Sequence, residues 1–196
     1  MLKTALARRI RLIGLDVDGV LSDGGLYIGR VGDHAVELKR FHSQDGSGAW
    51  LLRRAGITLV LASGRRSEAT SIRAREMKVE EVLEDETGGG RKLATFAAML
   101  ARRGVAWDEC AFVGDDLADL PLLNRVALPI AVANAVPEVK AAAALVTRRA
   151  GGDGAVREVA ETILKARGVW NDLVQQYLQE RGDVEAPPPR RSSRAG

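Results

Sequence analysis

Apolar and polar positions along the chain follow two spacings. Short apolar runs bounded by glycine or polar side chains predict buried strands, and stretches with apolar residues three and four positions apart predict helices that face a core. The two kinds of segment alternate, which favours an α/β fold with a mostly parallel sheet flanked by helices. The predicted strands are 11–16, 57–62, 80–84, 110–114, 127–132 and 144–147, and the predicted helices are 45–55, 67–77, 91–103, 117–125, 137–142 and 154–167.

Two further segments lie outside this alternation. Alternating apolar and polar residues on either side of Gly29–Asp33 predict a β-hairpin over 26–38. Near the end of the chain, apolar residues at helical spacing predict an amphipathic helix over 169–180. The proline- and arginine-rich residues that follow are typical of disorder. We therefore expect one domain over 1–180 and a disordered basic tail over 181–196.

The distribution of charge and apolar residues gives no support to a nucleic-acid or membrane partner. The net charge is +3, but the 180 residues before the tail carry 25 basic and 24 acidic side chains. No apolar run reaches the length of a membrane span, and residues 1–11 lack the apolar segment of a signal peptide. The single cysteine, Cys110, begins an apolar run and is expected to be a small buried residue. These features predict a cytoplasmic protein.

Carboxylates follow two of the predicted strands. The run 12–15 ends in Asp16 and Asp18, one residue apart, and the run 110–114 ends in Asp115. Carboxylates this close repel one another unless a cation lies between them, and a hard divalent ion takes oxygen ligands of this kind. A strand followed by an ordinary Asp-Gly turn is the simpler alternative for the first segment alone. Because ligands bind beside the carboxyl ends of parallel strands, the two segments together favour a Mg²⁺ site.

Two other strand ends carry residues that can hold an anion. Ser63 follows the second predicted strand, where its hydroxyl and the start of a helix would suit a phosphate, although a Ser-Gly turn is also a common helix cap. Lys92 opens a helix, where a cation is unfavourable against the helix dipole, so it is either a solvated surface residue or is held there to neutralise an anion. Arg91 is a competing candidate for the same position.

Together these four strand ends predict phosphoryl transfer. Asp16 would attack phosphorus and form an aspartyl phosphate, and Asp18 would protonate the leaving oxygen and then activate water. Ser63 and Lys92 would bind the phosphoryl oxygens, and Lys92 would also offset the repulsion between nucleophile and phosphate. Mg²⁺ would polarise the phosphoryl group. The set of residues therefore predicts a phosphatase.

The motifs resemble those of the haloacid dehalogenase superfamily over about residues 10–165. Asp16-Val17-Asp18-Gly19-Val20 is similar to its first motif, Ser63 to its second, Lys92 to its third, and Gly114–Asp119 to its fourth. The resemblance implies a Rossmann-like sheet and a Mg²⁺ ion held by Asp16, the Asp18 carbonyl and Asp115. It also implies supporting roles for Asp116 and Asp119.

A narrower resemblance is to the 3-deoxy-D-manno-octulosonate 8-phosphate phosphatase family. The similar segments are 19–24, 41–48, 63–66 and 150–158. The resemblance implies a domain without a cap, a hairpin flap, a homotetramer and hydrolysis of a sugar-acid phosphate for lipopolysaccharide precursor synthesis. It also implies substrate contacts by Gly64, Arg65, Asp45 and Gly46.

The sequence departs from this family at three places, one of which is the helix around Trp170–Tyr177 together with the basic tail, both of which extend past the usual end. Gln44 stands where the family usually has a basic residue, and the glycine-rich loop 85–91 is long, which blurs the choice between Arg91 and Lys92. A phosphatase of nine-carbon sugar-acid 9-phosphates is an alternative, although Arg65 favours the eight-carbon substrate. A non-catalytic tetramerising module is a second alternative. The complete set of acids with Lys92 argues against it.

Overall fold

A six-stranded parallel sheet forms the centre of the protein. The computed structural model describes residues 2–84 and 91–182, so most of the predicted tail and of the glycine-rich loop lies outside the described residues. The strand order is β5-β4-β1-β6-β7-β8, and every neighbouring pair is parallel. The strands are β1 Leu12–Leu15, β4 Thr58–Ser63, β5 Glu81–Glu84, β6 Cys110–Gly114, β7 Leu128–Ala131 and β8 Leu145–Val146.

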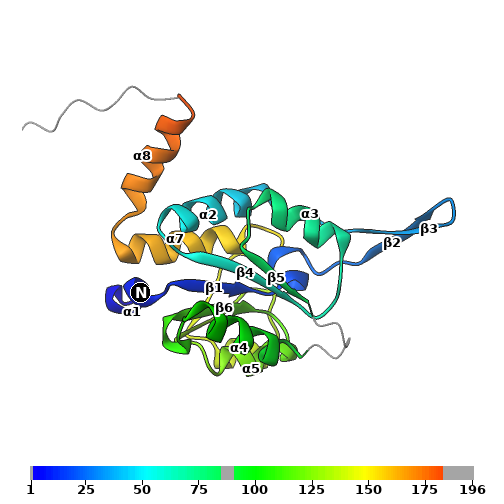
Figure 1. Cartoon of the computed structure of the whole chain (residues 1–196), viewed down its shortest axis with the longest axis horizontal. Coiled ribbons are helices and arrows are strands. Elements are labelled where there is room, and N and C mark those ends of the chain that lie inside the picture. Colours follow the sequence, from blue (N-terminus) through cyan, green and yellow to red (C-terminus); the bar gives the residue numbers. More distant parts are fainter. Residues whose placement is uncertain (1, 85–90, 183–196) are drawn as a thin grey trace, which may run out of the picture.

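Helices cover both faces of this sheet, as Figure 1 shows, with α2, α3 and α7 on one side and α4 and α5 on the other. The predicted α/β fold is therefore confirmed. The predicted helix over 117–125 is shorter in the structure, where a 3₁₀ turn precedes α5. The helices are α1 Thr4–Arg9, α2 Ser43–Arg54, α3 Glu68–Glu76, α4 Lys92–Arg103, α5 Leu120–Leu123, α6 Pro137–Ala142, α7 Ala155–Arg167 and α8 Trp170–Glu180.

The central position of β1 determines where the first carboxylates lie. All four of its residues are buried, because β4 and β6 flank it and helices cover its two faces. Cys110, at the start of β6, is fully buried as predicted, and burial raises the pKa of its thiol to about 12. The apolar core thus surrounds β1 and leaves only its carboxyl end open.

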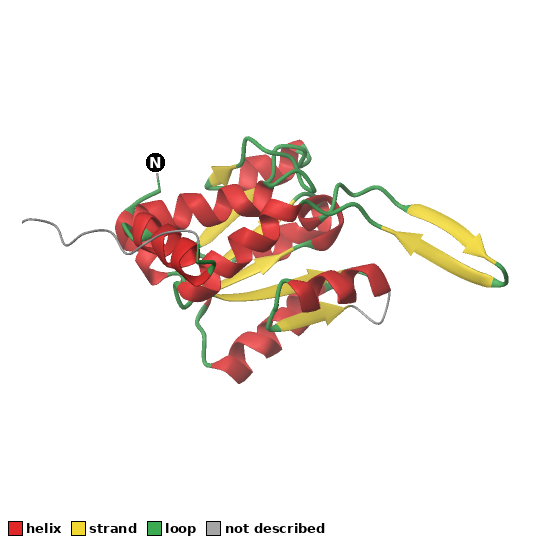
Figure 2. Ribbon diagram, turned by 90° about the horizontal axis from the view of Figure 1, so that it is seen from above, coloured by secondary structure: helices red, strands yellow, loops and turns green. Residues whose placement is uncertain are grey.

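A two-stranded antiparallel hairpin, β2 Tyr27–Val31 and β3 His34–Leu38, projects from the body of the molecule (Figures 1 and 2). Its apolar side chains are exposed, with Ile28 at 71%, Val31 at 67% and Leu38 at 66%. Within the described residues, this hairpin and α2 fill the segment between β1 and β4, and no cap domain is present.

The ends of the described chain are helical. The predicted C-terminal helix is present as α8, where Tyr177 packs edge-on against Trp50 of α2 with ring centroids 5.0 Å apart. The short helix α1 was not predicted from the sequence. It packs beside α7, whose Arg167 donates a hydrogen bond to the Ala7 carbonyl at 2.8 Å. No helix in the part of the chain that the structure describes is long and apolar enough to cross a membrane. The cytoplasmic location stays a prediction.

Candidate active site

The carboxyl ends of β1 and β6 lie side by side. The backbone N–H of Asp16 donates to the Val113 carbonyl at 3.0 Å, and a tight helical turn then begins at Val17. Gly19 in this turn has a φ of +101°, which favours glycine. A methyl group on Gly19 would lie 2.0 Å from Asp115 Oδ2, so only glycine lets the two strand ends approach this closely.

Three carboxylates and one ammonium meet at these strand ends. Asp16, Asp115 and Asp119 each contribute one carboxylate oxygen to a cluster whose members lie within 4.8 Å of one another. Lys92, the first residue of α4, forms an ion pair with Asp16 and donates to Asp119 Oδ1 at 2.8 Å. The other oxygen of Asp119 accepts from the Asp115 N–H at 3.0 Å. Asp119 therefore holds both Lys92 and the turn after β6 in place.

These residues line an open pocket of about 300 Å³. Four strand ends or the turns that follow them contribute to it, as the parallel topology predicts. Gly64 and Arg65 come after β4, and Asp18 comes after β1. The full lining is Asp16, Asp18, Gly64, Arg65, Lys92, Asp115, Asp116, Ala118 and Asp119.

The cluster carries more negative than positive charge, and the pKa values of its members reflect this. Burial and the charge of Asp119 raise the pKa of Asp16 well above its ordinary value, against the opposing effect of Lys92. Burial and Asp119 also raise the pKa of Asp115, to about 6. Burial acts to lower the pKa of Lys92, but the charges of Asp16 and Asp119 outweigh it and the pKa is raised. One ammonium does not balance three carboxylates.

The donor set fits a hard divalent cation. Asp115 Oδ1 is buried and has no hydrogen-bond partner among the described residues, although Asp16 and Asp119 lie beside it. A buried carboxylate oxygen without a partner is costly, and a Mg²⁺ ion would satisfy it and balance the excess charge. The oxygens of Asp119 are already occupied by Lys92 and backbone N–H groups. Asp16 and Asp115 are therefore the side chains best placed to hold the ion.

The predicted anion-binding residues differ in their placement. Lys92 lies in the pocket with its side chain 6% exposed, whereas Arg91 is an exposed residue outside the pocket lining. Ser63 is 1% exposed, and its hydroxyl donates to the Arg65 carbonyl at 2.8 Å. The structure therefore brings Lys92 and Arg65 to the pocket, with Ser63 directly behind the turn that carries Arg65.

Asp45 and Gly46 lie apart from this pocket. Asp45 is fully buried in the first turn of α2, and its Oδ1 accepts from the Arg157 N–H at 2.8 Å, which joins α2 to α7. Gly46 borders a separate hollow beside Trp50 and Tyr177. A substrate contact by Asp45 or Gly46 stays a prediction.

Lys39, which the sequence did not identify as a site residue, forms an ion pair with Asp18. Its ammonium lies 2.7 Å from Asp18 Oδ1 and 3.6 Å from Glu37 Oε1. Glu37 in turn pairs with Arg65 of the pocket. The two-residue spacing of Glu37 and Lys39 would place both side chains on one face of a strand, but Lys39 follows the end of β3 and no sequence pattern pairs it with Asp18.

A second missed contact fixes the turn that follows Asp18. Asn134 donates through Nδ2 to the Gly19 carbonyl at 3.0 Å and accepts through Oδ1 from the Gly151 N–H at 2.7 Å. A methyl group on Gly151 would lie 1.7 Å from the Gly19 carbonyl oxygen. The glycine-rich segment before α7 therefore packs directly on the turn that carries Asp18.

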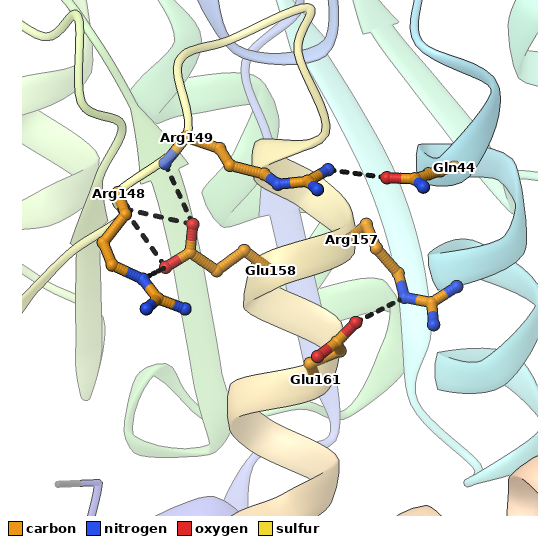
Figure 3. Close-up of a pocket in the computed structure, with 6 residues that line it drawn as sticks. All are labelled: Gln44, Arg148, Arg149, Arg157, Glu158 and Glu161. Atoms are coloured by element: carbon orange, nitrogen blue, oxygen red, sulfur yellow. Dashed lines mark hydrogen bonds and ion pairs between the residues drawn. The ribbon is translucent and has the colours of Figure 1, made fainter.

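A larger hollow of about 450 Å³ lies along α7 (Figure 3). Both of its acids form ion pairs within the hollow: Arg157 donates to Glu161 at 2.9 Å, and Arg148 donates to Glu158 at 3.3 Å. The Arg149 guanidinium donates to the Gln44 side chain at 2.6 Å, so a cation lies beside Gln44. None of the acids that line the pocket at the strand ends lines this hollow.

Comparison with known proteins agrees with this geometry. Residues 82–159 match the family model described as haloacid dehalogenase-like hydrolase. The chain is 40% identical over 174 residues to the 3-deoxy-D-manno-octulosonate 8-phosphate phosphatase of Escherichia coli K12, and the match covers 89% of each chain. These similarities confirm the resemblance predicted from the motifs.

Solved structures of this kind of phosphatase have the same fold as this chain. The 3-deoxy-D-manno-octulosonate 8-phosphate phosphatase of Moraxella catarrhalis, in complex with magnesium ion, phosphate ion and KDO, superposes with a TM-score of 0.82 at 33% identity, covering 89% of this chain and 97% of that one. The cobalt-bound deoxy-D-mannose-octulosonate 8-phosphate phosphatase of Haemophilus influenzae gives a TM-score of 0.77 at 33% identity, covering 88% and 99%. The likeness therefore extends over nearly the whole described chain.

Proposed function

Because this chain belongs to the 3-deoxy-D-manno-octulosonate 8-phosphate phosphatase family of haloacid dehalogenase-like hydrolases, we propose that it releases phosphate from 3-deoxy-D-manno-octulosonate 8-phosphate. It is then a Mg²⁺-dependent phosphoric monoester hydrolase that serves lipopolysaccharide precursor synthesis. The pairing of Lys92 with Asp16 and Asp119 carries the proposal, because it places a cation beside a carboxylate at the open end of β1.

In the first half of the reaction, a carboxylate oxygen of Asp16 attacks phosphorus. The bond between phosphorus and the sugar oxygen breaks, an aspartyl phosphate forms, and Asp18 donates a proton to the leaving oxygen. The Lys92 ammonium lies beside Asp16 and offsets the repulsion between this carboxylate and the phosphate. Ser63 binds a phosphoryl oxygen once its hydroxyl leaves the Arg65 carbonyl.

In the second half, Asp18 takes a proton from water, and the water oxygen attacks phosphorus. The bond between phosphorus and the Asp16 oxygen breaks, so phosphate leaves and the carboxylate is restored. Arg65 lies at the pocket and supplies a guanidinium for an anionic group of the substrate. The same aspartate thus serves as acid in one half and as base in the other.

Asp16, Asp115 and the main-chain carbonyl of Asp18 would hold the Mg²⁺ ion. Once bound, the ion supplies charge compensation for the phosphoryl oxygens and for the excess carboxylates. Asp119 contributes by holding Lys92 and the backbone of Asp115. Asp116 accepts from the Leu117 N–H at 2.7 Å, which shapes the same turn.

The test is phosphate release from a panel of substrates. The panel contains the eight-carbon 8-phosphate, a nine-carbon sugar-acid 9-phosphate and a simple hexose phosphate, each with Mg²⁺ or with EDTA. We expect the highest kcat/KM with the eight-carbon ester, no turnover with EDTA, and no turnover by Asp16→Asn. A higher kcat/KM with the nine-carbon ester would replace the proposed substrate, and release that is insensitive to EDTA would contradict the proposed cofactor.

We also propose that the protein is a homotetramer assembled through the β2–β3 hairpin. The hairpin exposes apolar side chains and two strand edges, and a two-stranded hairpin is too small to bury a core of its own. Light scattering should give about four times the 21.0 kDa chain mass. Ile28→Lys should reduce this mass, whereas Val146→Lys, an exposed apolar position on β8, should not. A fully active monomer would contradict the proposal.

A further inference from the structure

Lys39 is a buried lysine at the base of the hairpin, immediately after β3. Its side chain has no exposed area. Its ammonium forms ion pairs with Asp18 Oδ1 at 2.7 Å and with Glu37 Oε1 at 3.6 Å, and it donates a hydrogen bond to Thr70 Oγ1 at 3.2 Å. A buried ammonium that is satisfied in this way is fixed in position, because breaking any of the contacts leaves a charge without a partner.

The acceptors are themselves held by other elements. Thr70 is a fully buried residue of α3, and Glu37 accepts from the Ser67 hydroxyl at 2.7 Å while it pairs with Arg65. Lys39 is thus anchored to β3 and to α3, both of which lie outside the turn that carries Asp18. Lys39 therefore fixes the Asp18 carboxylate through elements that do not belong to the turn after β1.

Lys39 does not line the catalytic pocket. It is the only lysine or arginine paired with Asp18 among the ion pairs of the described residues, and the Ser22 hydroxyl, at 3.4 Å, is the other contact to this carboxylate. A carboxylate without Lys39 would be drawn toward the remaining cations of the pocket, because opposite charges attract strongly where water is partly excluded. Each of the two aspartates after β1 is therefore paired with a different lysine: Asp16 with Lys92, and Asp18 with Lys39.

We propose that Lys39 is a positioning residue that fixes the Asp18 carboxylate where it can give and take a proton. The inference rests on the proposed function, because it assigns a purpose to the acid and base of that reaction. Substrate binding does not depend on this contact, whereas both proton transfers by Asp18 do. Loss of the contact should therefore lower kcat and leave KM nearly unchanged.

The decisive variant is Lys39→Met, which keeps the length of the side chain and removes the charge. General acid–base catalysis contributes about 10²–10⁴-fold to a rate, so we expect a loss in kcat of about 10- to 100-fold with the sugar-acid phosphate, smaller than that of Asp18→Asn. In the Asp18→Asn background, Lys39→Met should cause no further loss, because residues that act as a unit are not additive. Lys165→Met, an exposed lysine of α7, is the matched control and should match the unmodified protein.

A second substrate separates positioning from a general structural role. 4-Nitrophenyl phosphate has a leaving group that departs without a proton, so only the hydrolysis of the aspartyl phosphate needs Asp18. Lys39→Met should then release one equivalent of nitrophenolate per active site in a rapid burst, followed by slow turnover, and phosphate should stay on the enzyme. The sugar-acid phosphate should give no such burst, because its leaving oxygen needs the proton.

Several results would overturn the inference. A raised KM with unchanged kcat would make Lys39 a substrate contact, and equal losses with both substrates without a burst would make it a structural residue. Additive losses in the Asp18→Asn background would show that Lys39 acts elsewhere. If circular dichroism shows that Lys39→Met does not fold, Lys39→Arg is measured in the same way. A folded Lys39→Arg with unchanged kcat and KM then supports the role of the charge. A raised KM with unchanged kcat overturns the inference. An unmodified protein that cleaves 4-nitrophenyl phosphate but not the sugar-acid ester would refute the proposed substrate and leave the burst comparison valid.

Discussion

Asp115→Asn should stabilise the protein without metal and abolish its activity. Asp115 has a buried carboxylate oxygen with no partner and lies beside two other carboxylates. Burial and the charge of Asp119 raise its pKa to about 6. An acid whose pKa is higher in the folded than in the unfolded protein stabilises folding only while it is protonated. Stability is therefore retained below the unfolded pKa and falls as the pH rises through about 6.

The size of this effect follows from the pKa. A rise from the ordinary Asp value to about 6 corresponds to about 3 kcal/mol in full. Because the side chain is partly open to solvent, screening reduces the effect, and we expect about 1 to 2 kcal/mol. For a chain of this size, that difference corresponds to about 3 to 6 °C in Tm.

Thermal melts at pH 4.5 and pH 7.5, with EDTA and with Mg²⁺, test this reasoning. Without metal, Asp115→Asn should melt above the unmodified protein at pH 7.5 and close to it at pH 4.5. With Mg²⁺ at pH 7.5, the unmodified protein should gain Tm, because the ion binds only the folded state, and the variant should gain much less. Asp33→Asn, at the exposed turn of the hairpin, is the control. A variant that melts below the unmodified protein at pH 7.5 without metal, or that keeps the full Mg²⁺ shift, would refute the argument.

Three further variants probe the pocket. Asp16→Asn should fold normally by circular dichroism and show no phosphate release, and measurable turnover would contradict its role as the nucleophile. Lys92→Ala should lower kcat by at least about 100-fold because it leaves three carboxylates uncompensated, whereas Arg91→Ala should have a small effect; the opposite ranking would assign the anion contact to Arg91. Gly151→Ala should reduce the free energy of unfolding in urea by about 1 to 3 kcal/mol, because the added methyl meets the Gly19 carbonyl, and an unchanged value would mean that this segment moves freely.

The sequence predicted the sheet and most of the pocket for a physical reason. Parallel strands bring their carboxyl ends to one edge, so the residues that follow each strand can be placed together without knowledge of distances. Asp16, Asp115 and Lys92 were found in this way. The rule does not cover insertions, and Lys39 reaches Asp18 from a hairpin whose direction the spacing of residues does not determine.

The short helix α1 escaped prediction for a different reason. Ala7 is its one buried residue, so it has no apolar periodicity to detect. The guanidinium of Arg167 fixes it by bonding to the Ala7 and Ile10 carbonyls, and these contacts exist only in the folded chain. Likewise, the contacts of Asn134 with Gly19 and Gly151 join three segments that are distant in sequence.

The position of β1 between β4 and β6 has a consequence for the newly made protein. The pocket draws on residues from Asp16 to Asp119, so a chain that is still leaving the ribosome holds Asp16 and Asp18 long before it holds Asp115 and Asp119. The first half of the chain can pair β1 with β4 alone, which leaves one edge of β1 open until β6 arrives. Hydrolytic capacity therefore appears late in synthesis, and a prematurely terminated chain cannot consume its substrate.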